Sequence, residues 1–204
     1  MTTDCFNITC RGAWHEQEGI PCEDNSLSVK ANGITIAVVC DGHGAEQYFR
    51  SKLGSKFATE AVKETVIAMA DDNFSDFIKG KPFTAYGPMR GKDVSNITDM
   101  AYLMICNLVL NIIQCWDEKV KRHVETHPLT DEEAKLIPEN LAEAFRAGKV
   151  FNFAYGTTLL AYVQTNDCWL AFQIGDGKII TFNGDAAEVT VMDDELCHDN
   201  ITTS

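Results

Sequence analysis

Two short acidic segments of the chain carry the side chains best suited to chemistry. The first is the adjacent pair Glu23-Asp24, and the second is Asp41, the first residue of the sequence DGHG. Asp41 follows the apolar run ITIAVVC, so it is expected to project from the end of a buried strand while the glycines let the backbone approach a ligand. Taken alone, DGHG is equally compatible with a strand-to-helix turn in which Asp41 caps the helix.

A predicted β-hairpin brings the two acidic segments together. Apolar and β-branched residues predict strands near 27–31 and 34–40, and the pair Asn32-Gly33 between them is a hairpin turn signal. Asp24 and Asp41 both lie about eight residues from this turn, so the hairpin places them at the same end of the sheet. Carboxylates this close repel one another unless cations are bound, which predicts a metal site at that end.

Helical periodicity dominates the middle of the chain. Apolar residues recur at helical spacing over 45–69, and further helices are expected over 98–125 and 131–147. The last of these begins with Thr130-Asp-Glu-Glu133, which is a capping-box sequence. Glycines and prolines between the first two helices predict a long loop over 71–96.

Strand-type alternation precedes and follows these helices. A first strand is expected near 6–10, followed by a loop through Gly12, Gly19 and Pro21. After Tyr155 the pattern predicts antiparallel hairpins in series. The strand-like runs are GTTLLAYVQ, CWLAFQIGD, KIITFN and AEVTVMD, separated by Asn166-Asp167, Asp176-Gly177 and Asn183-Gly184. The order strands, helices, strands indicates an α+β fold rather than an alternating parallel one.

Composition narrows the class of protein. The 204 residues include 17 Lys and Arg against 30 Asp and Glu, a formal charge of -13 at pH 7. The resulting field repels nucleic acid and anionic membrane surfaces, so neither is an expected partner. The most apolar segment, 100–116, is shorter than a comfortable membrane span and predicts a buried core helix. Eight cysteines, several inside apolar runs and with no signal peptide before them, indicate free thiols in a cytoplasmic compartment.

The ordered set of motifs is similar to that of the metal-dependent protein phosphatases of type 2C, the PPM family. It comprises RGAWHEQEGIPCEDNS, an apolar strand ending in DGHG, an amphipathic helix, and then YGTTLLAYV and FQIGDGKII. The resemblance implies a four-layer α-β-β-α sandwich of antiparallel sheets, as a single domain over 1–204 with a helical insert at about 71–150. It also implies hydrolysis of phosphoserine and phosphothreonine in phosphoprotein substrates by a metal-activated water.

The resemblance assigns roles to particular residues. It implies that Asp41 bridges two Mg²⁺ or Mn²⁺ ions and that Gly42 offers its carbonyl oxygen. Glu23 and Asp24 resemble the residues that bind or orient metal-bound waters, which makes Asp24 a candidate catalytic residue as well as a metal ligand. His43 is the candidate general acid for the leaving oxygen.

Other positions match the family less closely. Asp176, in the sequence GDGK, matches a family turn whose aspartate takes part in a further metal position, although turn chemistry alone favours an ordinary hairpin there. Where the family commonly has a phosphate-binding arginine this sequence has Gly19, so Arg11 and His15 of the preceding loop are the candidate phosphate-binding residues. Two downstream aspartates of the family have no convincing match, which predicts a domain that is incomplete at its C-terminus.

Two alternative functions stay open. One is a non-catalytic member of the same fold that acts as a binding or regulatory module. The other is an unrelated metal hydrolase, which would require Asp24 and Asp41 to lie far apart. His123 and His127 have the spacing of helical metal ligands, but the glutamate that a metalloprotease needs beside the first histidine is absent, so a solvated helix end is predicted there.

Overall fold

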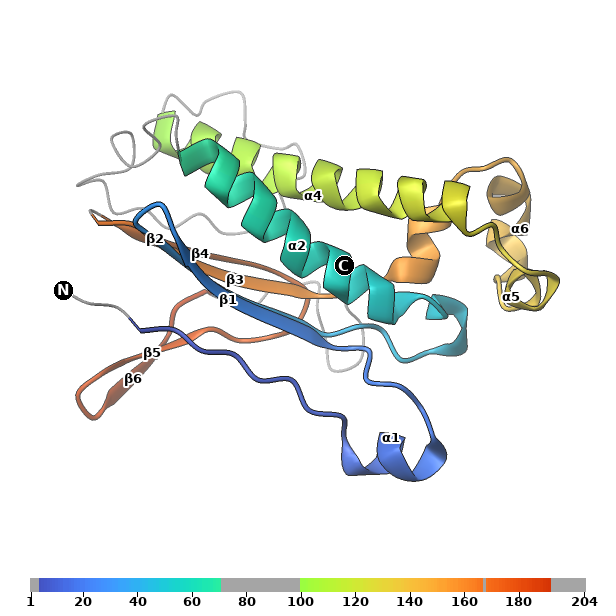
Figure 1. Ribbon diagram of the computed structural model, residues 1–204, viewed down its shortest axis with the longest axis horizontal. Coiled ribbons are helices and arrows are strands. Elements are labelled where there is room, and N and C mark those ends of the chain that lie inside the picture. Colours follow the sequence, from blue (N-terminus) through green and yellow to red (C-terminus); the bar gives the residue numbers. More distant parts are fainter. Residues whose placement is uncertain (1–3, 71–99, 167, 192–204) are drawn as a thin grey trace.

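The computed structural model describes residues 4–70, 100–166 and 168–191. A four-stranded antiparallel sheet lies at the centre, with long helices on one face and a short β-hairpin on the other (Figure 1). In order across the sheet, its strands are β1 (Asn25–Ala31), β2 (Ile34–Cys40), β3 (Leu159–Gln164) and β4 (Trp169–Ile174). The predicted α+β fold with antiparallel sheets is confirmed.

The β1–β2 hairpin forms as predicted. Asn32 and Gly33 have φ values of 51° and 77°, the left-handed conformation that a tight hairpin turn requires. The register pairs Asn25 with Cys40, so the residues just beyond each strand, Asp24 and Asp41, leave the sheet side by side. The hairpin therefore brings the two acidic segments to one end of the sheet.

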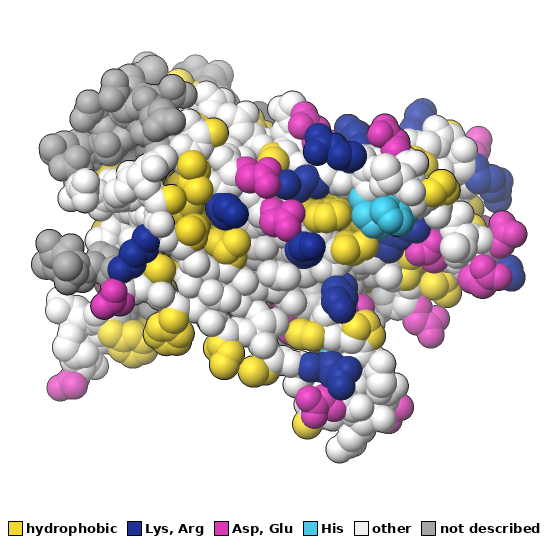
Figure 2. Space-filling view, in the orientation of Figure 1, with side chains coloured by type: hydrophobic (Ala, Val, Ile, Leu, Met, Phe, Trp, Pro, Cys, Tyr) yellow, Lys and Arg dark blue, Asp and Glu magenta, His cyan; other side chains and the backbone are white. Residues whose placement is uncertain are grey.

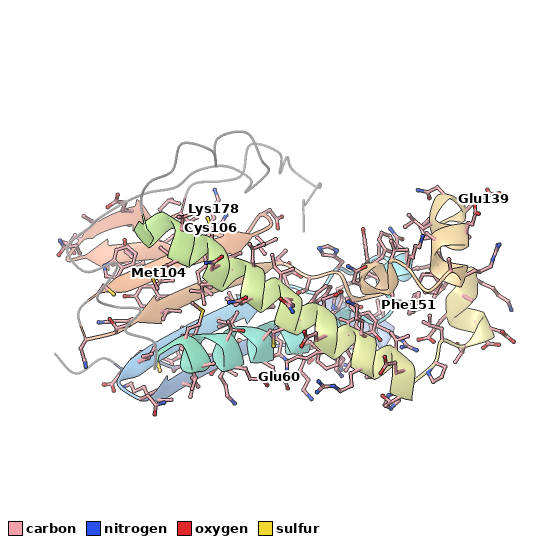
Figure 3. All side chains as sticks on the ribbon, turned by 90° about the horizontal axis from the view of Figure 1, so that it is seen from above. Glu60, Met104, Cys106, Glu139, Phe151 and Lys178 are labelled. Atoms are coloured by element: carbon pink, nitrogen blue, oxygen red, sulfur yellow. The ribbon has the colours of Figure 1, made fainter. Side chains whose placement is uncertain are left out.

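Two long helices cover one face of the sheet. They are α2 (Ser51–Ala70) and α4 (Met100–Thr126), and α4 lies across α2 when the molecule is seen from above (Figure 3). Alternate residues of β2, namely Ile34, Ile36 and Val38, are buried against these helices. The core of the molecule thus lies between the helices and the sheet, while Val39 on the opposite face of β2 is exposed.

Two of the predicted helices differ from the structure in their bounds. The first begins at Ser51 rather than near residue 45, after a 3-10 turn, η1 (Glu46–Tyr48), because hydrogen bonds to residues 154–158 hold residues 41–50 as a loop. The helix predicted over 131–147 is interrupted, because a proline lacks the N–H of a helical residue and disfavours helix at the preceding position. It forms α5 (Asp131–Lys135) and α6 (Glu139–Arg146), separated at Pro138. The capping box of Thr130 and Glu133 is confirmed.

The N-terminal segment differs more from the prediction. No strand forms over 6–10; this segment instead contacts β1 through side chains, with Asn7 donating to the Ser26 carbonyl at 3.1 Å. Its apolar side chains Phe6 and Ile8 are exposed. The loop predicted to follow contains a short helix, α1 (Ala13–Glu18).

The hairpin after β4 is displaced from the main sheet. Strands β5 (Ile180–Asn183) and β6 (Ala186–Val189) pair with each other across the predicted Asn183-Gly184 turn and form a separate sheet on the face opposite the helices (Figure 1). The hairpin predicted across Asp176-Gly177 is wrong, because the chain turns at Gly175 (φ 95°) and leaves the sheet, so β4 pairs with β3 and not with β5.

Several sequence predictions concern other parts of the chain. The loop over 71–96 lies outside the described residues. The expected helical insert includes α4, α5 and α6 in its described part, followed by a 3-10 turn, η3 (Phe151–Tyr155), that leads into β3.

All seven cysteines in the described ranges are free thiols. No helix in these ranges combines the length and the apolarity that a membrane crossing requires.

Candidate functional site

The acidic residues meet at the end of the β1–β2 hairpin. A hydrogen bond joins the side chains of Asp24 and Asp41. Partial burial first, and then the charge of Asp24, this hydrogen bond and the charges of Asp176 and Glu23, together raise the pKa of Asp41 to about 6. Neighbouring carboxylates that share a proton in this way repel one another when both ionise. The alternative that required Asp24 and Asp41 to lie far apart is therefore wrong.

Helix α2 fixes the neighbouring Glu23. Ser51 Oγ donates to Glu23 Oε1 at 2.9 Å, and Ser55 Oγ donates to the Glu23 carbonyl oxygen. Both serines are fully buried, and Thr59, one turn further along, donates to Asn25 Oδ1 at 3.3 Å. These three residues recur every four positions on the sheet-facing side of the helix. The sequence prediction missed them, although buried hydroxyls at this spacing on an otherwise apolar helix face are a detectable signal.

Gly42 lets the two acidic segments touch. A side chain at this position would collide with the carbonyl oxygen of Glu23, so only glycine allows the backbones to approach this closely. Gly42 pairs with Thr157 in an isolated antiparallel bridge whose hydrogen bonds are made by the residues on either side of each partner. The carbonyl of Gly42 lies outside that bridge, as a carbonyl that offers its oxygen to a cation must.

The YGTT sequence clamps the backbone of Asp41. The Asp41 amide donates to Thr158 Oγ1 at 3.0 Å, and the Asp41 carbonyl accepts from the Thr158 amide at 2.8 Å and from Thr157 Oγ1 at 3.0 Å. The His43 amide donates to the Gly156 carbonyl at 3.1 Å. The sequence prediction used YGTT only as one of the motifs that carry the family resemblance. In the structure these residues set the position of the aspartate.

His43 lies at the edge of the acidic cluster. Its ring meets the ring of Tyr48 edge to face, with centroids 4.6 Å apart, and its Nδ1 lies against Gly156. Partial burial lowers the pKa of His43, and the charge of Asp176 opposes that shift. The imidazole is therefore close enough to Asp176 to feel its charge.

Asp176 belongs to the same cluster. It is exposed just after β4, and its charge acts on both Asp41 and His43. Because β4 and β5 do not pair, the residue is not explained as part of an ordinary hairpin. Its role as a metal ligand stays a prediction, which its place beside Asp41 supports.

The two candidate phosphate-binding residues lie just before and within α1. Arg11 is exposed just before α1, and His15 is half-buried within α1 beside the ring of Trp14. Helix α1 lies outside the layers of the fold (Figure 1). Their role in binding the substrate phosphate stays a prediction.

The donor set of the cluster fits a hard divalent cation. Within the described residues, no three His, Cys, Asp or Glu side chains form a group that could hold a metal ion by themselves. Mg²⁺, however, is usually bound by one or two carboxylates and keeps several waters. Asp24 and Asp41 supply that pair, and the raised pKa of Asp41 shows that negative charge accumulates where a cation would neutralise it.

The other histidines differ from the prediction of a solvated helix end. His123 Nδ1 lies 2.7 Å from the hydroxyl of the fully buried Tyr155, and its ring stacks on that of His127 with centroids 4.4 Å apart. The first histidine is therefore part of a buried polar network, and only the second is exposed.

A comparison with protein families gives one match. A family model described as protein phosphatase 2C matches residues 11–204. The matched range includes both acidic segments of the hairpin, the YGTT clamp and Asp176. No curated protein matches the chain with significant similarity.

Proposed function

Because the chain belongs to the protein phosphatase 2C family, we propose that it hydrolyses phosphoserine and phosphothreonine in proteins with the help of divalent metal ions. The observation that carries the proposal is that Asp24 and Asp176 lie close enough to Asp41 for their charges to add to the effect of burial in raising its pKa to about 6. A phosphorylated substrate would be repelled by this cluster and by the net charge of -13. Bound cations reverse the local sign and make the site attractive to phosphate.

The residues of the cluster have distinct roles in this proposal. Asp41 and the carbonyl of Gly42 hold Mg²⁺ or Mn²⁺, two ions in the complete site, and Asp24 and Glu23 bind or orient the coordinated waters. Asp176 belongs to a further metal position. The ions supply two kinds of chemistry when bound, since they neutralise phosphoryl oxygens and lower the pKa of a bound water.

His43 is the proposed general acid. Its ring lies at the edge of the acidic cluster, from where it would donate a proton to the leaving serine or threonine oxygen. The lowered pKa of His43 makes its protonated form a stronger acid than an exposed imidazolium. The nearby carboxylate of Asp176 opposes this shift.

Phosphoprotein substrates are the proposed partners. Arg11 and His15 remain the proposed contacts to the substrate phosphate. The free thiols of the described cysteines support a reducing, cytoplasmic location.

The test is metal-dependent hydrolysis by the protein from its full reading frame. We expect Mn²⁺-dependent hydrolysis of p-nitrophenyl phosphate and of a phosphothreonine peptide, lowered by roughly 100-fold or more in Asp41→Ala because a metal ligand is lost. Glu118→Ala, which removes an exposed acid from α4, is the matched control and retains activity. Binding of Mn²⁺ by a folded protein without any hydrolysis would reject the enzyme and favour the non-catalytic module.

A further inference from the structure

The loop over 41–50 is anchored at both of its ends to one segment, residues 154–158. At the near end, Gly156 and the two threonines bind the backbone of Asp41 and His43, as described above. At the far end, the amide of Arg50 donates to the carbonyl of Ala154 at 2.9 Å. The position of the acidic cluster therefore depends on both anchors.

The side chain of Arg50 secures the far anchor. It is 8% exposed, and its Nε and Nη2 donate to the two carboxylate oxygens of Glu133 at 2.8 and 2.9 Å. Its Nη1 donates to the Tyr155 hydroxyl at 2.9 Å and to the His127 carbonyl at 3.0 Å. The planar guanidinium thus joins the start of α2 to α5, to the end of α4 and to η3.

The position of Tyr155 affects the near anchor of the loop, because Tyr155 directly precedes Gly156. Its side chain is fully buried, and its backbone touches Gly54 so closely that a side chain on Gly54 would collide with the Tyr155 carbonyl. Arginine can only donate, so the Tyr155 oxygen accepts from Arg50, and the same hydroxyl is hydrogen-bonded to His123 Nδ1 at 2.7 Å. Hydrogen bonds on two sides thus hold the phenol in position.

Stability alone is a weak reason for this network. A buried ion pair contributes little more to stability than well-packed apolar side chains of similar volume would. Directional hydrogen bonds do fix geometry, and the groups that orient metal ligands strongly affect metal affinity. We propose that Arg50, with Tyr155 as its partner, is a positioning residue that holds the loop carrying Asp41, Gly42 and His43 in the metal-binding conformation. This inference rests on the metal site of the proposed function.

Three variants test the proposal. Arg50→Met removes the guanidinium and keeps an unbranched side chain, and Tyr155→Phe removes only the hydroxyl. The matched control is Lys119→Met, because Lys119 is a partly buried cation that pairs with Glu60 at 3.6 Å and Glu64 at 2.8 Å but lies away from the loop. Acidic and basic side chains are interspersed on this helical face of the molecule (Figure 2).

Two measurements are made at a temperature where circular dichroism shows each variant to be folded. In isothermal titration with Mn²⁺, we expect the dissociation constant to rise about tenfold in Arg50→Met, less in Tyr155→Phe and not at all in Lys119→Met. In amide hydrogen exchange, we expect faster exchange of the His43 amide in the first two variants only. A purely stabilising role of Arg50 would leave the Mn²⁺ affinity unchanged in the folded variants and would speed exchange of the His43 amide no more than that of the protected amides of β2.

The outcomes separate this proposal from the proposed function. Wild-type Mn²⁺ affinity and wild-type His43 exchange in folded Arg50→Met and Tyr155→Phe would overturn the positioning role, and if Arg50→Met does not fold, Tyr155→Phe decides. A wild-type protein that binds no Mn²⁺ would overturn the metal site and the proposed function. In that case faster His43 exchange in the variants would still show that Arg50 anchors the loop.

Discussion

Two groups of polar side chains lie at the same end of the molecule and have opposite electrostatic balance. In the acidic cluster, partial burial and then neighbouring carboxylates raise the pKa of Asp41 to about 6. In the network behind it, hydrogen bonds from Arg50 lower the pKa of Glu133 below its usual value. The acidic cluster carries negative charge without a cationic partner, whereas the network pairs Arg50 with Glu133. This difference indicates that the residues of the cluster are suited to bind a cation and that the residues of the network hold the surrounding structure in place.

The largest expected effect comes from breaking the compensated group. Arg50→Met leaves Glu133 without its bidentate partner and the Tyr155 hydroxyl without a donor. Removing one member of a buried pair costs about 3 kcal/mol, taken at the low end because Glu133 is partly exposed. For a chain of this size that corresponds to a fall in Tm of about 6–12 °C by differential scanning calorimetry. If Tm of Arg50→Met falls no further than Tm of Lys119→Met, the Arg50 network stabilises the fold no more than another partly buried ion pair does, and the contrast with the acidic cluster is lost.

An opposite effect is expected in the acidic cluster. The folded-state pKa of Asp41, about 6, lies above its ordinary value of 3.8, so ionisation of this side chain opposes folding as pH rises through about 6. Asp41→Asn removes that charge. Because the side chain is only partly buried and the repulsion is screened by solvent, the expected gain for the metal-free protein at pH 7.5 is only about 2–4 °C in Tm.

Two controls sharpen this second prediction. At pH 5 the advantage of Asp41→Asn should be smaller than at pH 7.5, and it should vanish only below about pH 3.8, where Asp41 is protonated in both the folded and the unfolded protein. The exposed Glu118→Gln should give no comparable gain at either pH. An Asp41→Asn protein that is less stable than the wild type at pH 7.5 would show that the cluster is not repulsive.

The smallest expected effect comes from protonation of His123, which belongs to the network around Arg50. Burial, the charge of His127 and the charge of Arg50 lower the pKa of His123, while Glu133 opposes the shift. His123 therefore favours folding at pH above its ordinary value of about 6.5, and this contribution is lost as pH falls below that value. Its neutral form is the one that accepts from the Tyr155 hydroxyl.

His123→Gln keeps an acceptor for Tyr155 and cannot be protonated. Between pH 7 and 5.5 we expect Tm of the wild type to fall by roughly 1–2 °C more than Tm of this variant, measured by thermal unfolding in the absence of metal. His15→Gln, on α1, serves as the control that keeps the wild-type slope. Parallel pH profiles for wild type and His123→Gln would show that His123 does not exchange a proton in this range.

Local sequence signals predicted part of this arrangement and missed the rest. Asn32-Gly33 and the flanking strands placed Asp24 and Asp41 together, because a two-residue turn fixes the register of both strands. The strand expected over 6–10 did not form, because side chains rather than a backbone ladder hold that segment against β1. The break at Pro138 could have been predicted, because proline interrupts a helix, but the sequence prediction extended one helix across it.

Long-range contacts limit how much of the candidate site can be predicted from the sequence. Arg50, Glu133 and Tyr155 are far apart in sequence, and nothing in their local patterns indicates that they meet. Asp176 was predicted on resemblance while its turn suggested a hairpin, and only the separate pairing of β5 with β6 removes that explanation. Ser51 is different, because its regular spacing from Ser55 on a helix face could have been recognised.

The strand order also has a consequence for the time course of folding. The β1–β2 hairpin closes over two residues, whereas β3 reaches β2 only after the whole intervening helical region. Because closing a long loop is entropically costlier and slower, the hairpin forms first and β3 docks later. Asp24 and Asp41 are thus expected to become neighbours early in folding, before Thr157 and Thr158 fix Asp41. Pulse-labelled amide exchange that protects β3 before β1 and β2 would reverse this order.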